Sequence, residues 1–187
     1  EPYRRQRQMR IRDSYTSEDI KNAKGEVLLE KDSLIEQRVT DEKGQITFTA
    51  DLPVDGKYYV KEVFAPDGFV TTDEVQEFTF EYAGEDQAEV SYDFTFENQS
   101  TTVELSKTDL TTGEELPGAH LKVTDSDGNT VDEWTSTEES HVVKELVVGK
   151  KYTMTETKPA DGYVTAESIT FTVENTAEIQ KVEMKDD

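Results

Sequence analysis

One stretch of sequence occurs twice in this chain of 187 residues. Residues 57–71 read KYYVKEVFAPDGFVT and residues 151–165 read KYTMTETKPADGYVT. Each copy begins with Lys-Tyr, places a Glu four residues after the tyrosine, and continues through a proline to Asp-Gly and an aromatic residue. Each copy is later followed by a Phe-Thr-x-Glu-Asn segment, at residues 94–98 and 171–175. These repeats predict two homologous domains, which we place at residues 1–99 and 100–187.

The two copies differ in length. From the Glu to the Asn is 36 positions in the first copy (62 to 98) and 19 in the second (156 to 175). We therefore expect an extra hairpin in the first domain near residues 82–87, where YAGEDQ supplies turn-forming residues. Other hairpin turns are expected at residues 41–44, 55–56 and 125–129.

Alternation of apolar and polar residues dominates the segments between these turns, and they are rich in Thr, Val, Tyr and Phe, as strands are. Hydrophobic residues make up 33% of the chain, which is enough for thin sandwiches whose strands bury one face. We therefore predict an all-β protein with two tandem β-sandwich domains.

The charge and composition exclude several functions. A formal net charge of −22 argues against binding to nucleic acid or anionic lipid, both of which require clustered Lys and Arg. The absence of cysteine removes disulfides and thiolate metal sites. The two histidines are isolated, so we expect neither a metal nor a cofactor. No apolar run is long enough for a transmembrane helix, so we expect no membrane insertion of this fragment.

The first twelve residues, EPYRRQRQMRIR, carry five arginines in an otherwise acidic chain and show no strand alternation. We interpret residues 1–12 as a segment that is not a normal part of the first domain.

Three strands of the second domain each place one polar residue on an apolar face. Successive side chains of a strand point to opposite faces, so residues two apart share a face. By this rule Lys107 follows Val103 and Leu105, Glu156 follows Tyr152 and Met154, and Asn175 follows Phe171 and Val173. The pattern predicts a Lys, a Glu and an Asn inside the second domain.

Such a trio can react. A dry interior disfavours charge, so it favours the neutral amine of Lys107 and the protonated acid of Glu156. The protonated Glu156 could then polarise the carboxamide of Asn175 and pass a proton to departing ammonia. The product would be a Lys107–Asn175 isopeptide bond, formed once and without cofactor. The plainer alternative is a buried Lys–Glu ion pair, with Asn175 at the end of a strand.

Residues 107–123, KTDLTTGEELPGAHLKV, together with TETKPADGY and FTVEN, resemble the Cna-B-type repeat of collagen adhesins and the related SpaA-type pilin domains. The resemblance covers nearly all of the second domain and the first domain from about Glu26. It implies a prealbumin-like, inverse-immunoglobulin β-sandwich. It also implies an amide between the first-strand lysine and a last-strand asparagine, promoted by the glutamate, at the positions of Lys107, Asn175 and Glu156.

The first domain matches the pattern only in part. Glu62 and Asn98 occupy the corresponding positions, but the lysine strand is missing. Counting back from Glu62 by the spacing of Lys107 and Glu156 leads to Asp13, which is not a lysine. The residues before it, 1–12, contain arginines but no lysine, and an arginine cannot act as the nucleophile because it stays protonated. We therefore expect a vestigial or incomplete site and no cross-link within the first domain. A sandwich lacking an edge strand would leave an open sheet edge that invites a partner strand.

These features, with the resemblance, indicate a structural stalk module of a Gram-positive pilin or cell-wall-anchored adhesin. The expected location is extracellular, in the cell wall or pilus, and the expected partners are neighbouring domains or subunits. The alternative function is an adhesin module that binds a host matrix protein or a carbohydrate. We do not expect an enzyme, apart from the single-turnover self-cross-linking.

Overall fold

The structure is a computed structural model, and it describes residues 10–41, 43–81, 84 and 90–187. The described residues form strands, turns and loops without any helix, which confirms the all-β prediction. None of the described segments is a helix that is long and apolar enough to cross a membrane. The extra hairpin expected near residues 82–87 lies almost entirely outside the described residues.

The chain divides into two compact units. Unit 1 contains the described residues up to Pro66 together with Thr71–Asn98. Unit 2 contains Gln99–Asp187 together with Asp67–Val70, a short segment from the loop after the first copy of the repeat.

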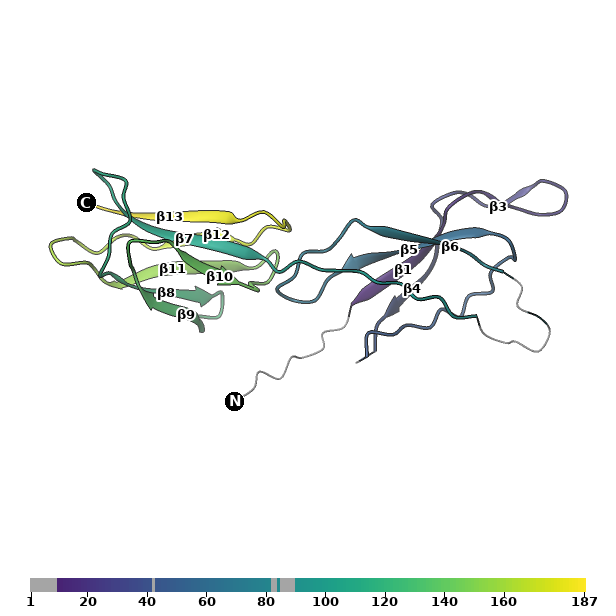
Figure 1. Cartoon of the computed structure of the whole chain (residues 1–187), viewed down its shortest axis with the longest axis horizontal. Coiled ribbons are helices and arrows are strands. Elements are labelled where there is room, and N and C mark those ends of the chain that lie inside the picture. The colour runs from purple at the N-terminus through teal and green to yellow at the C-terminus, as the bar shows by residue number, and fades with distance from the viewer. Residues whose placement is uncertain (1–9, 42, 82–83, 85–89) are drawn as a thin grey trace. The chain divides into compact units, whose positions relative to one another are not determined.

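Unit 1 is built on one antiparallel sheet with strand order β4-β1-β5-β6, and a small β2–β3 hairpin projects from it (Figure 1). Its strands are β1 (Ile11–Thr16), β2 (Ile20–Lys21), β3 (Val27–Leu29), β4 (Leu34–Val39), β5 (Lys57–Phe64) and β6 (Val75–Thr79). Because β1 starts at Ile11, Arg12 belongs to a central strand. The interpretation of residues 1–12 as foreign to the domain is therefore wrong for Arg12, while residues 1–9 lie outside the described part.

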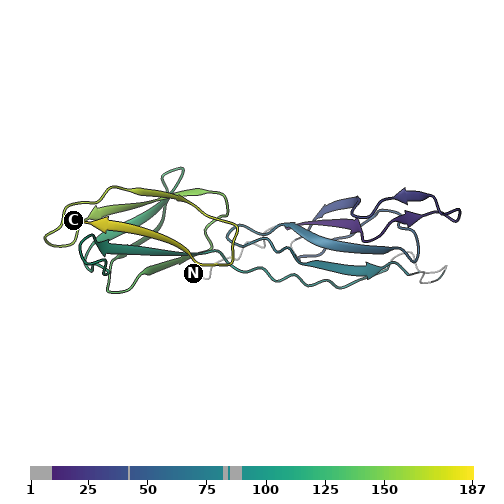
Figure 2. The same ribbon diagram turned by 90° about the horizontal axis from the view of Figure 1, so that it is seen from above.

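Unit 2 is a sandwich of two sheets, with strand orders β10-β7-β13 and β12-β11-β8-β9 (Figure 1). Figure 2 shows the yellow C-terminal strand β13 beside the teal β7, to which it pairs in parallel. The strands are β7 (Thr102–Asp109), β8 (His120–Asp125), β9 (Thr130–Thr135), β10 (His141–Lys144), β11 (Lys151–Lys158), β12 (Ile169–Thr172) and β13 (Gln180–Asp186).

Alternating side chains form the core of unit 2. Every second residue of β7 and β11 is buried, and these residues meet apolar side chains of β8 and β13 between the two sheets. Burial of this apolar surface drives the packing. The turn at residues 125–129 joins β8 to β9, with Asp125 Oδ1 accepting hydrogen bonds from the backbone N–H groups of Asp127 and Asn129. It is a hairpin turn, as the sequence predicted.

The strand pairings show how the two units correspond. Tyr58 of β5 lies opposite Phe78 of β6, just as Tyr152 of β11 lies opposite Phe171 of β12. Strand β6 is thus the counterpart of β12, and the FTFEN segment at residues 94–98 comes after it, where unit 2 has β13. The FTFEN and FTVEN segments are therefore similar in sequence but not equivalent in structure. FTVEN contains the end of β12, whereas FTFEN occupies the place of β13.

The first strands also differ from the expected correspondence. Glu62 lies opposite Arg12 of β1, and Glu156 lies opposite Leu121 of β8. Strand β1 is therefore the counterpart of β8, and Arg12 stands where unit 2 has a core leucine. The described residues of unit 1 contain no counterpart of the lysine-bearing β7.

Candidate functional site

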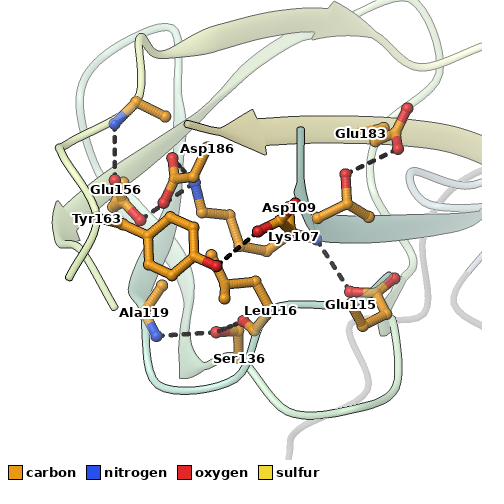
Figure 3. A network of polar contacts seen from close by, with 12 residues as sticks. Lys107, Asp109, Glu115, Leu116, Ala119, Ser136, Glu156, Tyr163, Glu183 and Asp186 are labelled. Carbon is orange, nitrogen blue, oxygen red and sulfur yellow. Dashed lines mark hydrogen bonds and ion pairs between the residues drawn. The ribbon is translucent and has the colours of Figure 1, made fainter. Parts of the chain in front are cut away.

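Three ionisable side chains meet in the interior of unit 2. Lys107 lies on β7, Asp186 lies on the neighbouring β13, and Glu156 lies on β11 of the other sheet. Their side chains are at most 1% exposed. Lys107 and Glu156 are thus buried, as their strand alternation predicted. Figure 3 shows the three groups converging.

The lysine amine contacts both acids. Lys107 Nζ lies 3.2 Å from Glu156 Oε1 and forms a hydrogen-bonded ion pair with Asp186 Oδ1. The other Glu156 oxygen, Oε2, accepts a hydrogen bond of 2.7 Å from the backbone N–H of Ala166. Asp186 Oδ2 is buried without a hydrogen-bond partner among the described residues. A dry interior penalises charged groups that are not paired, and here two acids share one amine.

The backbone around Lys107 is fixed by its neighbours. Its N–H donates to Glu115 Oε2 at 3.1 Å, and its carbonyl accepts from the Leu116 N–H at 2.7 Å. The next residue, Thr108, donates its hydroxyl to Glu183 Oε1 of β13 at 2.8 Å. This hydrogen bond lowers the pKa of Glu183. These contacts hold β7 and β13 in register and so keep the amine beside Asp186.

A tyrosine of the repeated motif closes one side of this region. Tyr163 Oη donates a hydrogen bond of 2.6 Å to Asp109 Oδ2 at the end of β7 (Figure 3). This bond lowers the pKa of Asp109, and it raises the pKa of Tyr163, to which the nearby charge of Asp186 also contributes. The other carboxylate oxygen of Asp109 accepts from the backbone N–H groups of Thr111 and Thr112, both at 2.7 Å.

The structure places Asn175 away from the buried cluster. Asn175 is exposed and lies beyond the end of β12. Its neighbour Glu174 bonds through its N–H to the side chain of Gln180, which is paired with Val103. Val103 is four residues from Lys107, which is about 13 Å along a strand. The expected Lys107–Asn175 pairing is thus corrected: the side chain beside the amine is that of Asp186.

Sequence reasoning missed Asp186 because the Phe-Thr-x-Glu-Asn match drew attention to the wrong strand. The signal that could have identified it is the alternation of Val182, Met184 and Asp186 at the C-terminal end of the chain. All three residues are buried on one face of β13.

Unit 1 brings its two predicted site residues together. Asn98 donates through Nδ2 to Glu62 Oε2, which also accepts a hydrogen bond of 3.4 Å from the backbone N–H of Thr72. Arg12 forms a buried ion pair with Glu62 Oε1, and its guanidinium lies 4.5 Å from the centre of the Phe96 ring. A buried arginine, which the sequence did not predict, therefore provides the positive charge that Lys107 provides in unit 2.

A metal site finds no support here. No cluster of three or more metal-ligating side chains occurs within residues 10–41, 43–81, 84 and 90–187.

Comparison with known proteins gives the family. The model of the SpaA prealbumin-like fold domain matches residues 8–95 and again residues 101–187. Among solved structures, the Bacillus anthracis TIE protein is 23% identical, with a TM-score of 0.56, over 96% of this chain and 30% of that protein. The C-terminal fragment of the pilus adhesin SpaC from Lactobacillus rhamnosus GG is 16% identical, with a TM-score of 0.47, over 95% of this chain and 87% of the fragment.

The shaft pilin SpaA from Lactobacillus rhamnosus GG is 18% identical, with a TM-score of 0.41, over 96% of this chain and 84% of the pilin. No curated protein sequence matches the chain. The two family matches cover most of the chain and coincide with the two copies of its repeat. The chain therefore belongs to the SpaA-type family of prealbumin-like fold domains.

Proposed function

We propose that the chain is an extracellular stalk module of a Gram-positive pilus or wall-anchored surface protein, and that unit 2 cross-links itself by an amide between Lys107 and Asp186. Family membership supports the structural role. The observation that carries the cross-link is the buried contact of the Lys107 amine with Asp186, beside Glu156.

The reaction needs only these three side chains. A proton first passes from the Lys107 ammonium to the Asp186 carboxylate, so that a neutral amine faces a neutral carboxyl group. The amine of Lys107 then attacks Cγ of Asp186, and the new C–N bond forms as the C–O bond to the departing hydroxyl oxygen breaks. Glu156 receives a proton from the attacking nitrogen and delivers one to that oxygen, which leaves as water. Burial keeps bulk water away from the tetrahedral intermediate and strengthens the polar contacts that stabilise it.

The bond would give unit 2 a short path for mechanical tension. Strand β7 opens the sandwich and β13 closes it, and the two run in parallel. A force that enters along β7 would cross from Lys107 to Asp186 and leave at the end of β13. Residues 108–185 would then bear no load, as a stalk requires.

Intact mass tests this proposal. The wild-type chain is expected to be lighter than its sequence by one water. A deficit of one ammonia would instead identify Asn175 as the acceptor, and the unmodified mass would exclude a cross-link. Peptide mapping should then find residues 107 and 186 in one branched fragment, even after complete denaturation.

The second candidate, ligand binding by an adhesin module, is favoured by one feature of unit 1. An open surface pocket of about 380 Å³ is lined by Tyr15, Tyr59, Lys61 and Asp73, among others. The two tyrosine rings stack at 5.2 Å, and Lys61 Nζ lies 4.7 Å from the centre of the Tyr15 ring. Aromatic faces combined with a few polar groups are typical of binding sites. A screen of glycans and matrix proteins, repeated with Tyr59→Ala, tests this function; a screen without binders excludes it.

A further inference from the structure

The loop between β11 and β12, residues 159–168, touches the region of the buried cluster at two points. Ala166 donates its backbone N–H to Glu156 Oε2 at 2.7 Å. Tyr163 donates its hydroxyl to Asp109 Oδ2 at 2.6 Å, as Figure 3 shows. The proposed reaction uses Glu156 directly, but it gives no role to Tyr163.

The Tyr163 hydrogen bond ties the loop to the strands that carry the reacting groups. Asp109 is the last residue of β7, two residues after Lys107. It lies opposite Asp186 in the parallel pairing of β7 with β13, and the Leu110 N–H donates to the Asp186 carbonyl at 2.7 Å. The hydrogen bond to Asp109 raises the pKa of Tyr163, and the charge of Asp186 adds to this effect. The tyrosine hydroxyl therefore lies close to the end of the strand pair that holds the amine and the acceptor.

The Ala166 hydrogen bond orients the carboxyl group of Glu156. One oxygen, Oε2, is held by the Ala166 N–H, and the other, Oε1, lies 3.2 Å from Lys107 Nζ. A catalytic side chain keeps a productive geometry when neighbouring hydrogen bonds fix its orientation. Ala166 follows Tyr163 by three residues in the same loop. Fixing the loop at Tyr163 therefore also fixes the N–H that holds Glu156.

Unit 1 contains a natural comparison. Its copy of the repeated motif has Phe69 at the position of Tyr163, so the hydroxyl is missing. The corresponding hydrogen bond in unit 1, from the Thr72 N–H to Glu62 Oε2, is 3.4 Å long, whereas that in unit 2 is 2.7 Å long. The copy with the tyrosine thus has the shorter hydrogen bond to its glutamate, as a link between the two contacts requires.

We propose that Tyr163 is a positioning residue for the cross-linking of unit 2, because it holds the loop that orients Glu156 toward the Lys107 amine. This inference rests on the proposed cross-linking reaction and adds no step to it. Glu156 still carries the proton, and Tyr163 neither gives nor takes one. Without the hydroxyl the loop is held less firmly, Glu156 Oε1 departs from the amine, and proton transfer slows.

The rate at which the chain loses water tests this role. The full chain is synthesised briefly in a cell-free system, synthesis is stopped, and samples are quenched in denaturant at intervals for intact mass. Fluorescence of Trp134, the single tryptophan, reports the folded fraction, so the rate is expressed per folded chain. Wild type is compared with Tyr163→Phe, which removes only the hydroxyl. It is also compared with Asp109→Ser, which removes the acceptor but keeps an oxygen for the turn that follows.

The matched control is Tyr152→Phe. Tyr152 is buried in β11, four residues before Glu156, and its hydroxyl accepts a hydrogen bond of 3.1 Å from the Val147 N–H. This variant also loses a hydrogen bond of a tyrosine hydroxyl in unit 2, but the partner lies outside residues 159–168.

Tyr163→Phe and Asp109→Ser are each expected to lose water roughly 10- to 100-fold more slowly than wild type, because a displacement of about 1 Å at a reacting group has effects of this size. Tyr152→Phe should react at the wild-type rate. A wild-type rate in Tyr163→Phe overturns the inference. An equal delay in Tyr152→Phe also overturns it, because the delay would then reflect general loosening of the fold.

Amide NMR provides a second readout that stability alone does not change. The Asp186→Ala chain lacks the acceptor, so Lys107 and Glu156 stay unlinked. The Ala166 N–H signal of this chain should lie downfield, because the group donates to a carboxyl oxygen. Adding Tyr163→Phe should move the signal upfield, and adding Tyr152→Phe should leave it in place. A signal that Tyr163→Phe does not move overturns the positioning role.

The wild-type mass separates failure of this inference from failure of the proposed function. If the wild-type chain loses water and Tyr163→Phe does so equally fast, only the role of Tyr163 is excluded. If the wild-type chain keeps its full mass, the cross-linking reaction is excluded, and the role of Tyr163 with it.

Discussion

Lys107 Nζ and Glu156 Oε1 lie 3.2 Å apart although they belong to opposite sheets of unit 2. The contact spans a sandwich whose core cluster consists of apolar side chains. A buried charge pair costs desolvation energy that its mutual attraction rarely exceeds, so it is weak evidence for stabilisation alone. With Asp186 as a third member, the cluster contains the groups that the proposed reaction requires.

The identity of the acceptor can be changed by one substitution. Asp186→Asn replaces the departing oxygen with a nitrogen, so the expected mass deficit changes from one water to one ammonia. Asp186→Ala and Glu156→Ala should both restore the full mass, the first because the acceptor is lost and the second because the proton carrier is lost. Intact mass of the three variants checks this. An unchanged water deficit in Asp186→Ala would show that Asp186 takes no part.

Pulling on the two ends of the chain should reveal the load path. With the cross-link in place, unit 2 is expected to give no extension step, because residues 108–185 are bypassed. Glu156→Ala should add a step on the order of 25 nm, the contour length that these residues release. Single-molecule force spectroscopy measures both. The step from unit 1 serves as the internal control, and equal traces for the two chains would contradict the proposed bridge.

Thermal unfolding can distinguish the contribution of the cross-link to the free energy of unfolding from that of the buried charges. The Lys107→Met/Asp186→Leu double variant removes both cross-linked side chains and leaves Glu156 as the one acid of the cluster. Loss of a loop closure over 79 positions, the difference between 186 and 107, is expected to lower the free energy of unfolding by about 4 kcal/mol. Lys107→Met alone should lose about 3 kcal/mol more, because two acids remain buried without a cation. Scanning calorimetry of unit 2 distinguishes these variants, and a double variant as stable as wild type would exclude the covalent contribution.

The sequence was sufficient to predict the sandwich class and the burial of Lys107 and Glu156, because alternation within a strand is a local property. It was not sufficient to predict the partner of Lys107. Asn175 continues the alternation of Phe171 and Val173 in sequence, but β12 ends at Thr172 and Asn175 is exposed. Alternation predicts a face only as far as the strand extends.

The pairing of Arg12 with Glu62 could not be predicted for a different reason. It depends on which strand lies beside β5, and that is decided by sheet topology. Applying the Lys107–Glu156 spacing to Glu62 aligned β1 with β7. In the structure β1 lies beside β5 as β8 lies beside β11, so β1 is the counterpart of β8. A fixed sequence offset between repeats fails when the connections between corresponding strands differ in length, as they do between Arg12 and Glu62 and between Leu121 and Glu156.

The bond from Tyr163 to Asp109 should make unit 2 sensitive to acid. Hydrogen bonding from Tyr163 lowers the pKa of Asp109 in the folded state. Such a group stabilises the fold above the ordinary aspartate pKa of about 4, and the contribution is lost as pH falls through the lower folded value. Tyr163→Phe should therefore lower the unfolding temperature of unit 2 at pH 7 and have a smaller effect near pH 2. A difference between variant and wild type that does not change with pH would contradict this assignment.

The Arg12–Glu62 pair should stabilise unit 1 only while both members are present. Arg12→Met leaves Glu62 buried without its cation and is expected to lower the free energy of unfolding of unit 1 by about 3 to 5 kcal/mol. The Arg12→Met/Glu62→Leu double variant replaces the pair with apolar side chains and should recover most of that loss. Chemical denaturation measures the two variants, with the transition of unit 2 as the internal control. If the double variant is as unstable as Arg12→Met, the stabilising contact of Arg12 is its packing on Phe96 rather than its charge.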